Sequence, residues 1–360
     1  MNNMDSIRRL ILVALSLVLF GLLGCFGIGP PILMRDRFDY NSAISDSWKQ
    51  QMLNNLVKIR YGDTPVFLDV TSVISQYVFA GGMNAQFGWS NMAGVGSDTQ
   101  SLGANLNYID RPTITYTPLS GQKFAQNLMT PLEPTVILSL VQSGYPVDLV
   151  FRLAVQAING IYNSVGRLLR AKPAQPEFYS LIERLQRIQD SQAMGIRVDK
   201  KEGMMIVFKG KANEALEADK RWVREALGLD VKRNDFSVVY GAVAANDREI
   251  AILSRSVLEI LTNLSSFVEV PAEHVEAKRV SAIVSEETLE GTLVPPPMSI
   301  HSSTLRPSDA FVAIRYHNHW FWIDDRDFRS KALFTFLYFL TSLTETGPKE
   351  GAPIITVPIN

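Results

Sequence analysis

Cysteine is almost absent from this chain. Of 360 residues only Cys25 is a cysteine, which excludes an internal disulfide and any cluster of thiolates with the spacing of a zinc finger or a redox pair. Without such cross-links the fold must be held by a buried apolar core, for which the 46% of apolar residues provide the material. The length suffices for two or three subdomains.

The chain also lacks a strong charge of either sign. Its 35 Lys and Arg residues stand against 36 Asp and Glu residues, and residues 1–24 contribute only Asp5, Arg8 and Arg9 to that balance. A surface that binds nucleic acid needs a strongly basic face. We therefore expect no nucleic acid among the partners.

Long apolar runs and familiar catalytic motifs are missing as well. After residue 24 no apolar run reaches the 18 or so residues of a membrane-spanning helix. The sequence contains no Gly-x-Ser-x-Gly, no glycine-rich phosphate loop and no His-Glu-x-x-His. We expect no second helical span, no cofactor and no enzyme of these classes.

The start of the chain carries a distinct pattern. Two arginines precede an apolar run at residues 10–23, and the small residue Gly24 stands before Cys25. A basic N-terminal region, a short apolar run and a small residue before the cleavage site are typical of a cleaved export signal. A membrane span, in contrast, needs about 20 apolar residues. We predict that residues 1–24 are a signal peptide.

The residues Leu22, Leu23, Gly24 and Cys25 resemble the lipobox of bacterial lipoproteins. This resemblance covers the first 25 residues and implies that the Cys25 thiol receives diacylglycerol, that palmitate is added, and that this residue becomes the new N-terminus. Two or three such chains anchor a protein stably to a membrane. Phe26 stands where an inner-membrane retention signal has Asp, so we expect a lipid anchor in the outer membrane with the body facing the periplasm. The body resembles uncharacterised envelope lipoproteins.

Shifts in composition suggest how the exported chain is divided. Lys172 to Pro176 contains two prolines and reads as a linker, and three consecutive prolines at 295–297 mark a polar stretch without periodicity. We expect a tether, an N-terminal α+β domain with a long hairpin, a middle α+β domain, a flexible loop and a C-terminal hairpin-helix unit at residues 25–43, 44–172, 177–284, 285–309 and 310–360.

The hydrophobic periodicity after the linker favours an α+β fold. Three arrangements of strand, strand and helix follow one another at residues 196–227, 236–267 and 311–343. In the second, a turn is expected at Asn246-Asp247 and a helix cap at Ser254. Such units predict antiparallel sheets with helices packed on one face.

Residues 148–163 fit two periodicities. Leu149, Leu153 and Ala157 have helical spacing, whereas Phe151, Leu153 and Val155 alternate as in a strand. We prefer a helix here.

A long period-two alternation occupies residues 73–89 and returns at 102–117. It predicts paired strands much longer than the usual five or six residues, with a bulge at Gly81-Gly82. A transmembrane strand needs about 9 to 11 residues with an apolar and a polar face, so one interpretation is an oligomeric outer-membrane pore with one such hairpin per subunit. The other is the flank of a soluble antiparallel sheet, which Asp110 and Pro112 favour because they interrupt the apolar face.

The strongest candidate for chemistry is a group of histidines and aspartates near the C-terminus. Histidines two apart on a strand share a face, and a carboxylate could complete a zinc site. The alternative is a polar turn around Asn318 followed by acidic residues that cap a helix, which we favour. The residues concerned are His317, His319, Asp324, Asp325 and Asp327.

These observations rank three functions. The first is a lipid-anchored, non-enzymatic scaffold or accessory subunit of an outer-membrane or periplasmic assembly, with protein partners or further copies of itself in the envelope. The second is a pore or export component built on the 73–117 hairpin. The third is a metal-dependent hydrolase at residues 317–327. We expect no catalytic or metal-binding residue, and lipid attachment at Cys25.

Overall fold

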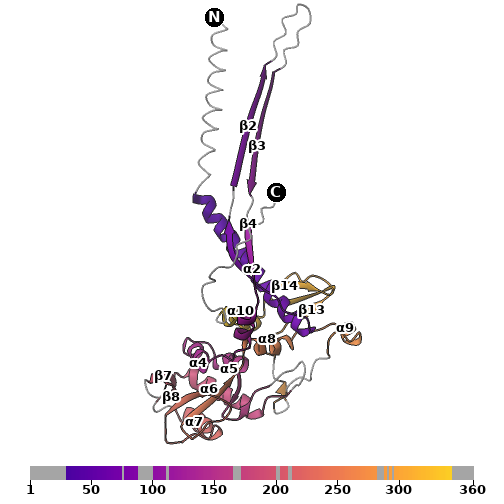
Figure 1. Cartoon of the computed structure of the whole chain (residues 1–360). Helices are drawn as coiled ribbons and strands as arrows, with labels where there is room; N and C mark the ends of the chain where they lie inside the picture. The colour runs from indigo at the N-terminus through magenta and orange to yellow at the C-terminus, as the bar shows by residue number, and fades with distance from the viewer. Residues whose placement is uncertain are drawn as a thin grey trace, which may run out of the picture. The chain divides into compact units, whose positions relative to one another are not determined.

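The computed structural model describes residues 30–74, 77–87, 100–110, 113–164, 172–199, 203–209, 213–281, 288–289, 292–293 and 296–342. These residues form two compact units, one of residues 30–65 and 129–342 and one of residues 66–128 (Figure 1). The chain is mixed α+β, which confirms the fold class inferred from the sequence. The linker expected at residues 172–176 lies inside the first unit. Within the described residues no helix is long and apolar enough to cross a membrane.

The second unit consists of two antiparallel strand pairs and a short helix. Its elements are β1 (Phe67–Ile74), β2 (Tyr77–Phe87), β3 (Gln100–Asp110), β4 (Thr113–Leu119) and α3 (Gln122–Met129). β1 pairs with β4 and β2 pairs with β3, and we call these two strand pairs the ladder. Helix α3 packs on the start of β1, where the ring centroids of Phe67 and Phe124 lie 5.6 Å apart.

The register of the ladder matches the alternation in the sequence. Phe79 is paired with Tyr108, and Met83 is paired with Ala104, so apolar positions of β2 meet apolar positions of β3. The predicted bulge at Gly81-Gly82 is absent, because these positions pair in unbroken register. The register shifts instead between Val70 and Ser72.

The first unit is built on a six-stranded sheet. Its strands, in spatial order, are β6 (Ile161–Tyr162), β5 (Val155–Ile158), β10 (Glu249–Ser254), β9 (Asp235–Tyr240), β8 (Gly203–Phe208) and β7 (Met194–Asp199). Four helices supply the apolar side chains that pack on one face of this sheet: α4 (Pro134–Gln142), α5 (Val147–Ala154), α6 (Pro176–Asp190) and α7 (Glu214–Ala226). This layering agrees with helices packed on one face.

Helices α6 and α7 follow directly from their sequence patterns. The apolar side chains of α6 that recur at helical spacing are all buried, and they are Phe178, Leu181, Ile182, Leu185 and Ile188. Asn213 caps α7 as expected, because its side chain accepts a hydrogen bond from the Leu216 amide at 2.9 Å.

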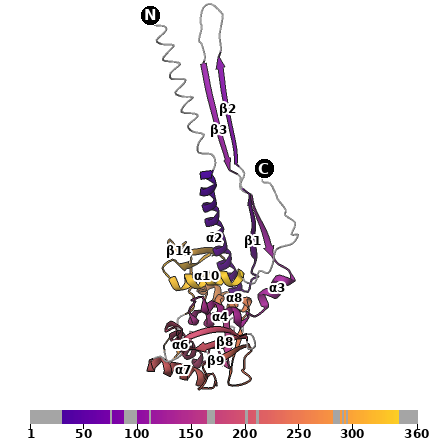
Figure 2. The same ribbon diagram turned by 90° about the vertical axis from the view of Figure 1, so that its left-hand side faces the viewer.

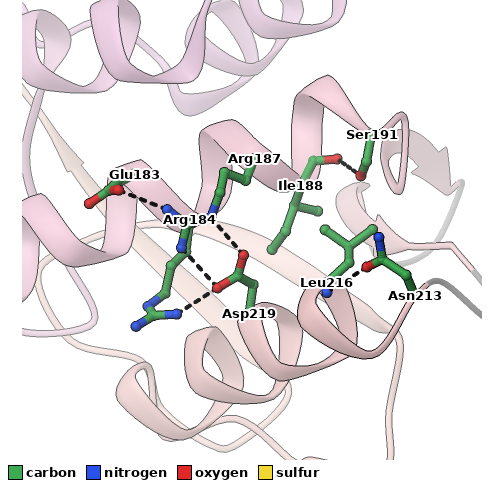
Figure 3. Close-up of polar contacts among 8 residues, drawn as sticks. All are labelled: Glu183, Arg184, Arg187, Ile188, Ser191, Asn213, Leu216 and Asp219. Atoms are coloured by element: carbon green, nitrogen blue, oxygen red, sulfur yellow. Dashed lines mark hydrogen bonds and ion pairs between the residues drawn. The ribbon is translucent and has the colours of Figure 1, made fainter.

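One aspartate joins these two helices (Figure 3). Asp219 of α7 accepts hydrogen bonds from Arg184 at 2.5 Å and from Arg187 at 2.8 and 2.9 Å. The Asp219 side chain is only 10% exposed, and the two arginines are 31% and 45% exposed. The carboxylate of α7 thus neutralises two guanidinium groups of α6 across the contact between the helices.

Replacing this carboxylate is expected to weaken the α6–α7 contact. Asp219→Asn keeps the shape but removes the carboxylate that pairs with Arg184 and leaves Arg187 with only the exposed Glu183, so the free energy of unfolding should fall by about 2–3 kcal/mol. Urea unfolding followed by circular dichroism measures this loss. The control is Glu183→Gln, because Glu183 pairs with Arg187 at 2.8 Å but is 70% exposed, and a change of under about 0.5 kcal/mol is expected. Equal losses in both variants would contradict the assignment.

The same contact gives an acid dependence. The hydrogen bonds from Arg187, then those from Arg184, hold the pKa of Asp219 below its ordinary value. A carboxyl whose pKa is lowered by folding stabilises the folded state above its unfolded pKa of about 3.9, and this contribution is lost as pH falls through the folded value. Below about pH 4 the unfolding free energy of Asp219→Asn should therefore depend less steeply on pH than that of the parent chain.

The direction in which β9 and β10 pair differs from the expectation. The turn expected at Asn246-Asp247 would join antiparallel strands, but β10 pairs with β9 in parallel, with Ile250 opposite Val238. The six residues of β9 rise about 20 Å, and the eight residues 241–248 can span up to about 28 Å. The connection is therefore just long enough to return beside β9, and the sheet is mixed.

Residues 148–163 divide between the two structures that the sequence allowed. They form α5 and then turn at Val155 into β5 and β6, so the preference for a helix was right only for the first part. The junction is held by one residue from outside the segment and by one at its end. Arg255 donates to the carbonyls of Arg152 and Leu153 at 3.1 Å, and Asn163 donates to the Val155 carbonyl at 2.8 Å.

The helix after β10 begins two residues later than expected. Helix α8 (Val257–Ser265) is capped by Ser256, whose hydroxyl accepts from the Glu259 amide, while the Glu259 carboxylate accepts from the Ser256 amide. This reciprocal pair is a capping box. Ser254 does not cap the helix, because it ends β10 and donates to the Leu132 carbonyl.

The remaining elements of the first unit are helices and a small sheet. They are α2 (Pro30–Arg60), α9 (Ala272–Glu276), α10 (Phe328–Ser342), the short antiparallel pair β11 (Thr288–Leu289) and β12 (Thr292–Leu293), and a sheet in the order β13 (His301–Ser303), β15 (His319–Asp324) and β14 (Ala310–Tyr316). The C-terminal part of α2 packs on β14 and α8. Figure 2 shows α10 crossing α2, where the Trp48 and Tyr338 rings stack at 5.1 Å.

Two segments are more ordered than the sequence suggests. Residues 285–309 were expected to be a flexible loop, but they include β13, and Met298 and Ile300 are fully buried. Helix α2 begins at Pro30, inside the expected tether at residues 25–43. Proline is favoured in the first turn of a helix, and no further proline or glycine follows Pro31 until Gly62, whose φ of 72° ends the helix.

Candidate functional site

The expected lipid-attachment residue lies outside the described part of the chain. Cys25 and residues 1–24 precede the first described residue, Pro30. Lipid attachment at Cys25 therefore stays a prediction.

The structure places His317 and His319 at the tip of a hairpin. His317 and Asn318 form the two-residue turn between β14 and β15, with φ of 44° and 67°, and Tyr316 pairs with His319. Positive φ at both central residues is the geometry of a type I′ hairpin turn, which asparagine tolerates well. This confirms the interpretation of the segment as a polar turn.

The three aspartates lie at the opposite end of β15. A strand rises about 3.3 Å per residue, so Asp324 is roughly 16 Å from His319. Each carboxylate is engaged locally: Asp324 accepts from the Arg326 amide at 2.8 Å, Asp325 pairs with Lys331 at 2.7 Å, and Asp327 accepts from the Ser330 amide at 3.0 Å. The structure thus does not bring these aspartates to the histidines, and Asp327 acts as a cap of α10.

The hairpin tip instead meets two residues from distant parts of the chain. Tyr61 follows α2, and His274 lies on α9. With Tyr316, His317 and His319 they form what we call the His–Tyr cluster, which holds three of the four histidines of the chain. The ring centroids of Tyr61 and His317 are 5.5 Å apart, and those of His274 and His319 are 4.9 Å apart.

Hydrogen bonds order the cluster. The Tyr61 hydroxyl and His274 Nδ1 are 2.6 Å apart. The Tyr316 hydroxyl donates to the Asp63 carboxylate at 3.1 Å. His319 Nδ1 lies 3.4 Å from the His317 carbonyl oxygen, which fixes that nitrogen as the donor. Each ring of the hairpin tip is therefore oriented by the end of α2 or by the turn itself.

Burial sets the charge states of these groups. His274 and His319 are 3% and 8% exposed. Desolvation, followed by the charge of His319, lowers the pKa of His274 below its ordinary value, so its ring is neutral at pH 7. Burial raises the pKa of Tyr61 to about 12, and burial followed by the hydrogen bond with Asp63 raises the pKa of Tyr316 to about 12. His274, Tyr61 and Tyr316 are therefore neutral donors and acceptors at pH 7.

A buried arginine fastens the end of α2 beside the cluster. The guanidinium group of Arg60 donates to the carbonyl oxygen of Ser281 at 2.9 Å and to its hydroxyl at 3.3 Å. Arg60 is 4% exposed. This contact ties the residue before Tyr61 to the chain that follows α9, and so holds His274 against Tyr61.

Sequence reasoning missed His274, Glu273 and Tyr61. Helix α9 has only five residues, too few for a hydrophobic period to show. Tyr61 and His274 are 213 residues apart in sequence, so no spacing rule relates them. Pro271, which immediately precedes α9, was the one local signal that a helix starts there.

The apolar cavity of the first unit is not a reaction site. It measures about 20 Å³ and lies between the six-stranded sheet and α4 to α7, lined only by apolar side chains. Such a space holds one water at most and carries no group that could bind it. The His–Tyr cluster therefore remains the only concentration of titratable side chains with functional geometry that we identify among the described residues.

No protein-family model, curated protein or solved structure matches this chain.

Proposed function

We propose that this protein is a lipid-anchored, non-enzymatic subunit of an assembly in the bacterial outer membrane or periplasm. In this proposal the lipid on Cys25 anchors the chain to the membrane, the first unit is its folded body, and the ladder binds other subunits. The near-neutral charge of the chain agrees with protein partners rather than nucleic acid.

The observation that carries the proposal is the two-stranded ladder. β2 and β3 have 11 residues each, and β1 and β4 form a second pair of 8 and 7 residues. Among the described residues neither strand pair has a third neighbour. A strand pair of this kind is only marginally stable on its own in water, and the edge of a sheet is a ready template for another chain. A partner strand or surface would supply the missing stabilisation.

The β1–β4 pair of the ladder also exposes apolar side chains. Leu68, Ile114 and Tyr116 are 38%, 39% and 49% exposed. The register places Tyr116 opposite Val70 and Leu68 opposite Pro118, so these positions form one face. Contiguous exposed apolar surface on a soluble unit is typical of an interaction site, which agrees with a ladder that is covered in the assembly.

Removal of the β2–β3 pair of the ladder tests this function. Replacing residues 77–110 by Asn-Gly supplies a type I′ turn at the end of the β1–β4 pair. We expect the partners that co-purify and cross-link with the lipidated chain to be lost, while the first unit keeps its unfolding temperature because it shares no strand with the ladder. Cross-linking in membranes followed by mass spectrometry measures the loss.

The matched control removes exposed apolar side chains elsewhere. Tyr240 and Val243 are 55% and 74% exposed in the first unit, and the double variant Tyr240→Ser with Val243→Ser should keep its partners. Loss of partners in this control, or their retention after excision, would refute the ladder as the assembly element.

The length of β2 and β3 supports a second candidate, a pore formed by several copies. Eleven residues at about 3.3 Å each give roughly 36 Å, which meets the 9 to 11 residues that a tilted transmembrane strand requires. Purified protein in lipid vesicles would then form a ring-sized homo-oligomer and conduct ions, and the excised variant would do neither. A hetero-complex without conductance would favour the first function.

A further inference from the structure

Three ligand atoms of the His–Tyr cluster converge on one point. His319 Nε2 lies 3.5 Å from Glu273 Oε1, and His274 Nε2 lies 3.8 Å from the same oxygen. All three atoms fall within 4.8 Å of one another. The atoms come from two elements, α9 and β15, that Arg60 and the hairpin turn hold in place.

These separations fit a shared cation better than direct hydrogen bonds. Strong hydrogen bonds between nitrogen and oxygen measure about 2.7–3.2 Å, so neither contact is a strong hydrogen bond. Ligand atoms about 2.05 Å from a tetrahedral zinc ion lie about 3.3 Å from one another. Adjacent ligands of an octahedral ion bound at about 2.1 Å lie only about 3.0 Å apart. The observed 3.5 and 3.8 Å are closer to the tetrahedral value.

The other nitrogen of each ring is held as metal sites require. Ligating histidines almost always donate their second N–H to a carbonyl, carboxylate or other acceptor. His319 Nδ1 faces the His317 carbonyl at 3.4 Å, and His274 Nδ1 faces the Tyr61 oxygen at 2.6 Å. Donation from both Nδ1 atoms leaves a lone pair on each Nε2, directed at the point that Glu273 shares.

We propose that Glu273, His274 and His319 bind a Zn²⁺ ion. The two imidazole nitrogens and the carboxylate oxygen provide three ligands, and the fourth position is open to water. Only His319 belongs to the group singled out in the sequence. The proposal goes beyond the assembly function and does not depend on it.

The binding test uses the full chain purified in detergent. After removal of metal with a chelator, Zn²⁺ alone is added and the bound ion is counted by elemental analysis. We expect one ion per chain, and a rise in unfolding temperature of about 5 °C when free Zn²⁺ exceeds its Kd a hundredfold. Co²⁺ in place of Zn²⁺ should show the intense visible absorption of tetrahedral coordination. No stoichiometric binding, or the faint spectrum of octahedral Co²⁺, would overturn the site as drawn.

Variants separate this site from other histidines. Glu273→Gln changes a side chain that is 68% exposed, so the fold should persist while Zn²⁺ affinity falls at least tenfold; His319→Ala should do the same. Tyr61→Phe removes the acceptor of the His274 Nδ1 proton and should weaken binding about 10- to 100-fold.

The control is the other histidine–carboxylate pair of the unit. His301 Nδ1 lies 2.9 Å from Glu269 Oε1, an ordinary hydrogen bond, so His301→Gln should bind Zn²⁺ with unchanged affinity. Unchanged affinity in Glu273→Gln and His319→Ala would overturn the proposal, and so would an equal loss in His301→Gln.

Discussion

Replacing Cys25 with serine is expected to release the protein from membranes. A serine hydroxyl cannot form the thioether that carries the diacylglycerol, so the chain would lose its two or three acyl chains. Each buried methylene contributes about 0.8 kcal/mol to membrane affinity, and the loss of whole chains should move nearly all of the protein to the soluble fraction. Membrane fractionation after an alkaline wash measures this shift, and mass spectrometry of the parent chain should find a lipidated N-terminal Cys25.

A second cysteine provides the control for position. Ser47 is exposed on α2, and a chain with Cys25→Ser and Ser47→Cys keeps one thiol but should remain soluble. The anchor would be disproved by an intact start methionine or an unmodified thiol at Cys25 in the parent chain. Retention of Cys25→Ser on washed membranes would disprove it as well.

Replacing Arg255 with alanine is expected to cause the largest loss of stability. Its guanidinium group is 4% exposed and donates to the carbonyls of Arg152, Leu153 and Ser164. Alanine leaves buried acceptors without donors at the junction of α5 and β5, at about 1–3 kcal/mol each. We expect the free energy of unfolding to fall by about 3–5 kcal/mol, a large part of the 5–15 kcal/mol typical of a folded protein.

Chemical denaturation of the parent and variant chains measures this loss. Arg248→Ala is the control, because Arg248 is exposed near the start of β10 and should change stability by no more than about 0.5 kcal/mol. Arg255→Lys should recover only part of the loss, since an ammonium group lacks the planar fork of arginine. A loss below about 1 kcal/mol in Arg255→Ala would show that water replaces the guanidinium group.

The elements that the sequence predicts well are those determined by neighbouring residues. Helix α6 shows its buried face at regular spacing, Asn213 signals the start of α7, and Asn318 marks the hairpin turn. In each case the residues that decide the structure lie within one or two turns of chain. Local periodicity, capping and turn chemistry therefore suffice.

The change from α5 to β5 shows why other parts could not be predicted. Residues 148–163 satisfy both periodicities, and the point of change is set by Arg255, about a hundred residues later. The parallel pairing of β9 and β10 is likewise determined by the rest of the sheet, not by the residues of the turn. Contacts of this kind leave no mark in a local pattern.

Only part of the candidate site could be predicted from the sequence. His317 and His319 were recognised because they are two residues apart, and they were matched to the aspartates nearest in sequence. The structure pairs them instead with His274 and Tyr61, which α2 and α9 bring from far along the chain. Residues that are close in sequence are not close in space here, because β15 separates His319 at its start from Asp324 at its end.

The length of α2 has a mechanical consequence for a chain moored at Cys25. Its 31 residues form a rod of about 46 Å, and residues 37–43, all exposed except the half-buried Tyr40, precede the part that packs on the body. In the proposed lipid-anchored protein, a helix of this length would influence both the distance of the body from the membrane and its rotation about the helix axis. Shortening it by seven residues lowers the body by about 10 Å with nearly the same heading, whereas removing two residues turns it by roughly 200°.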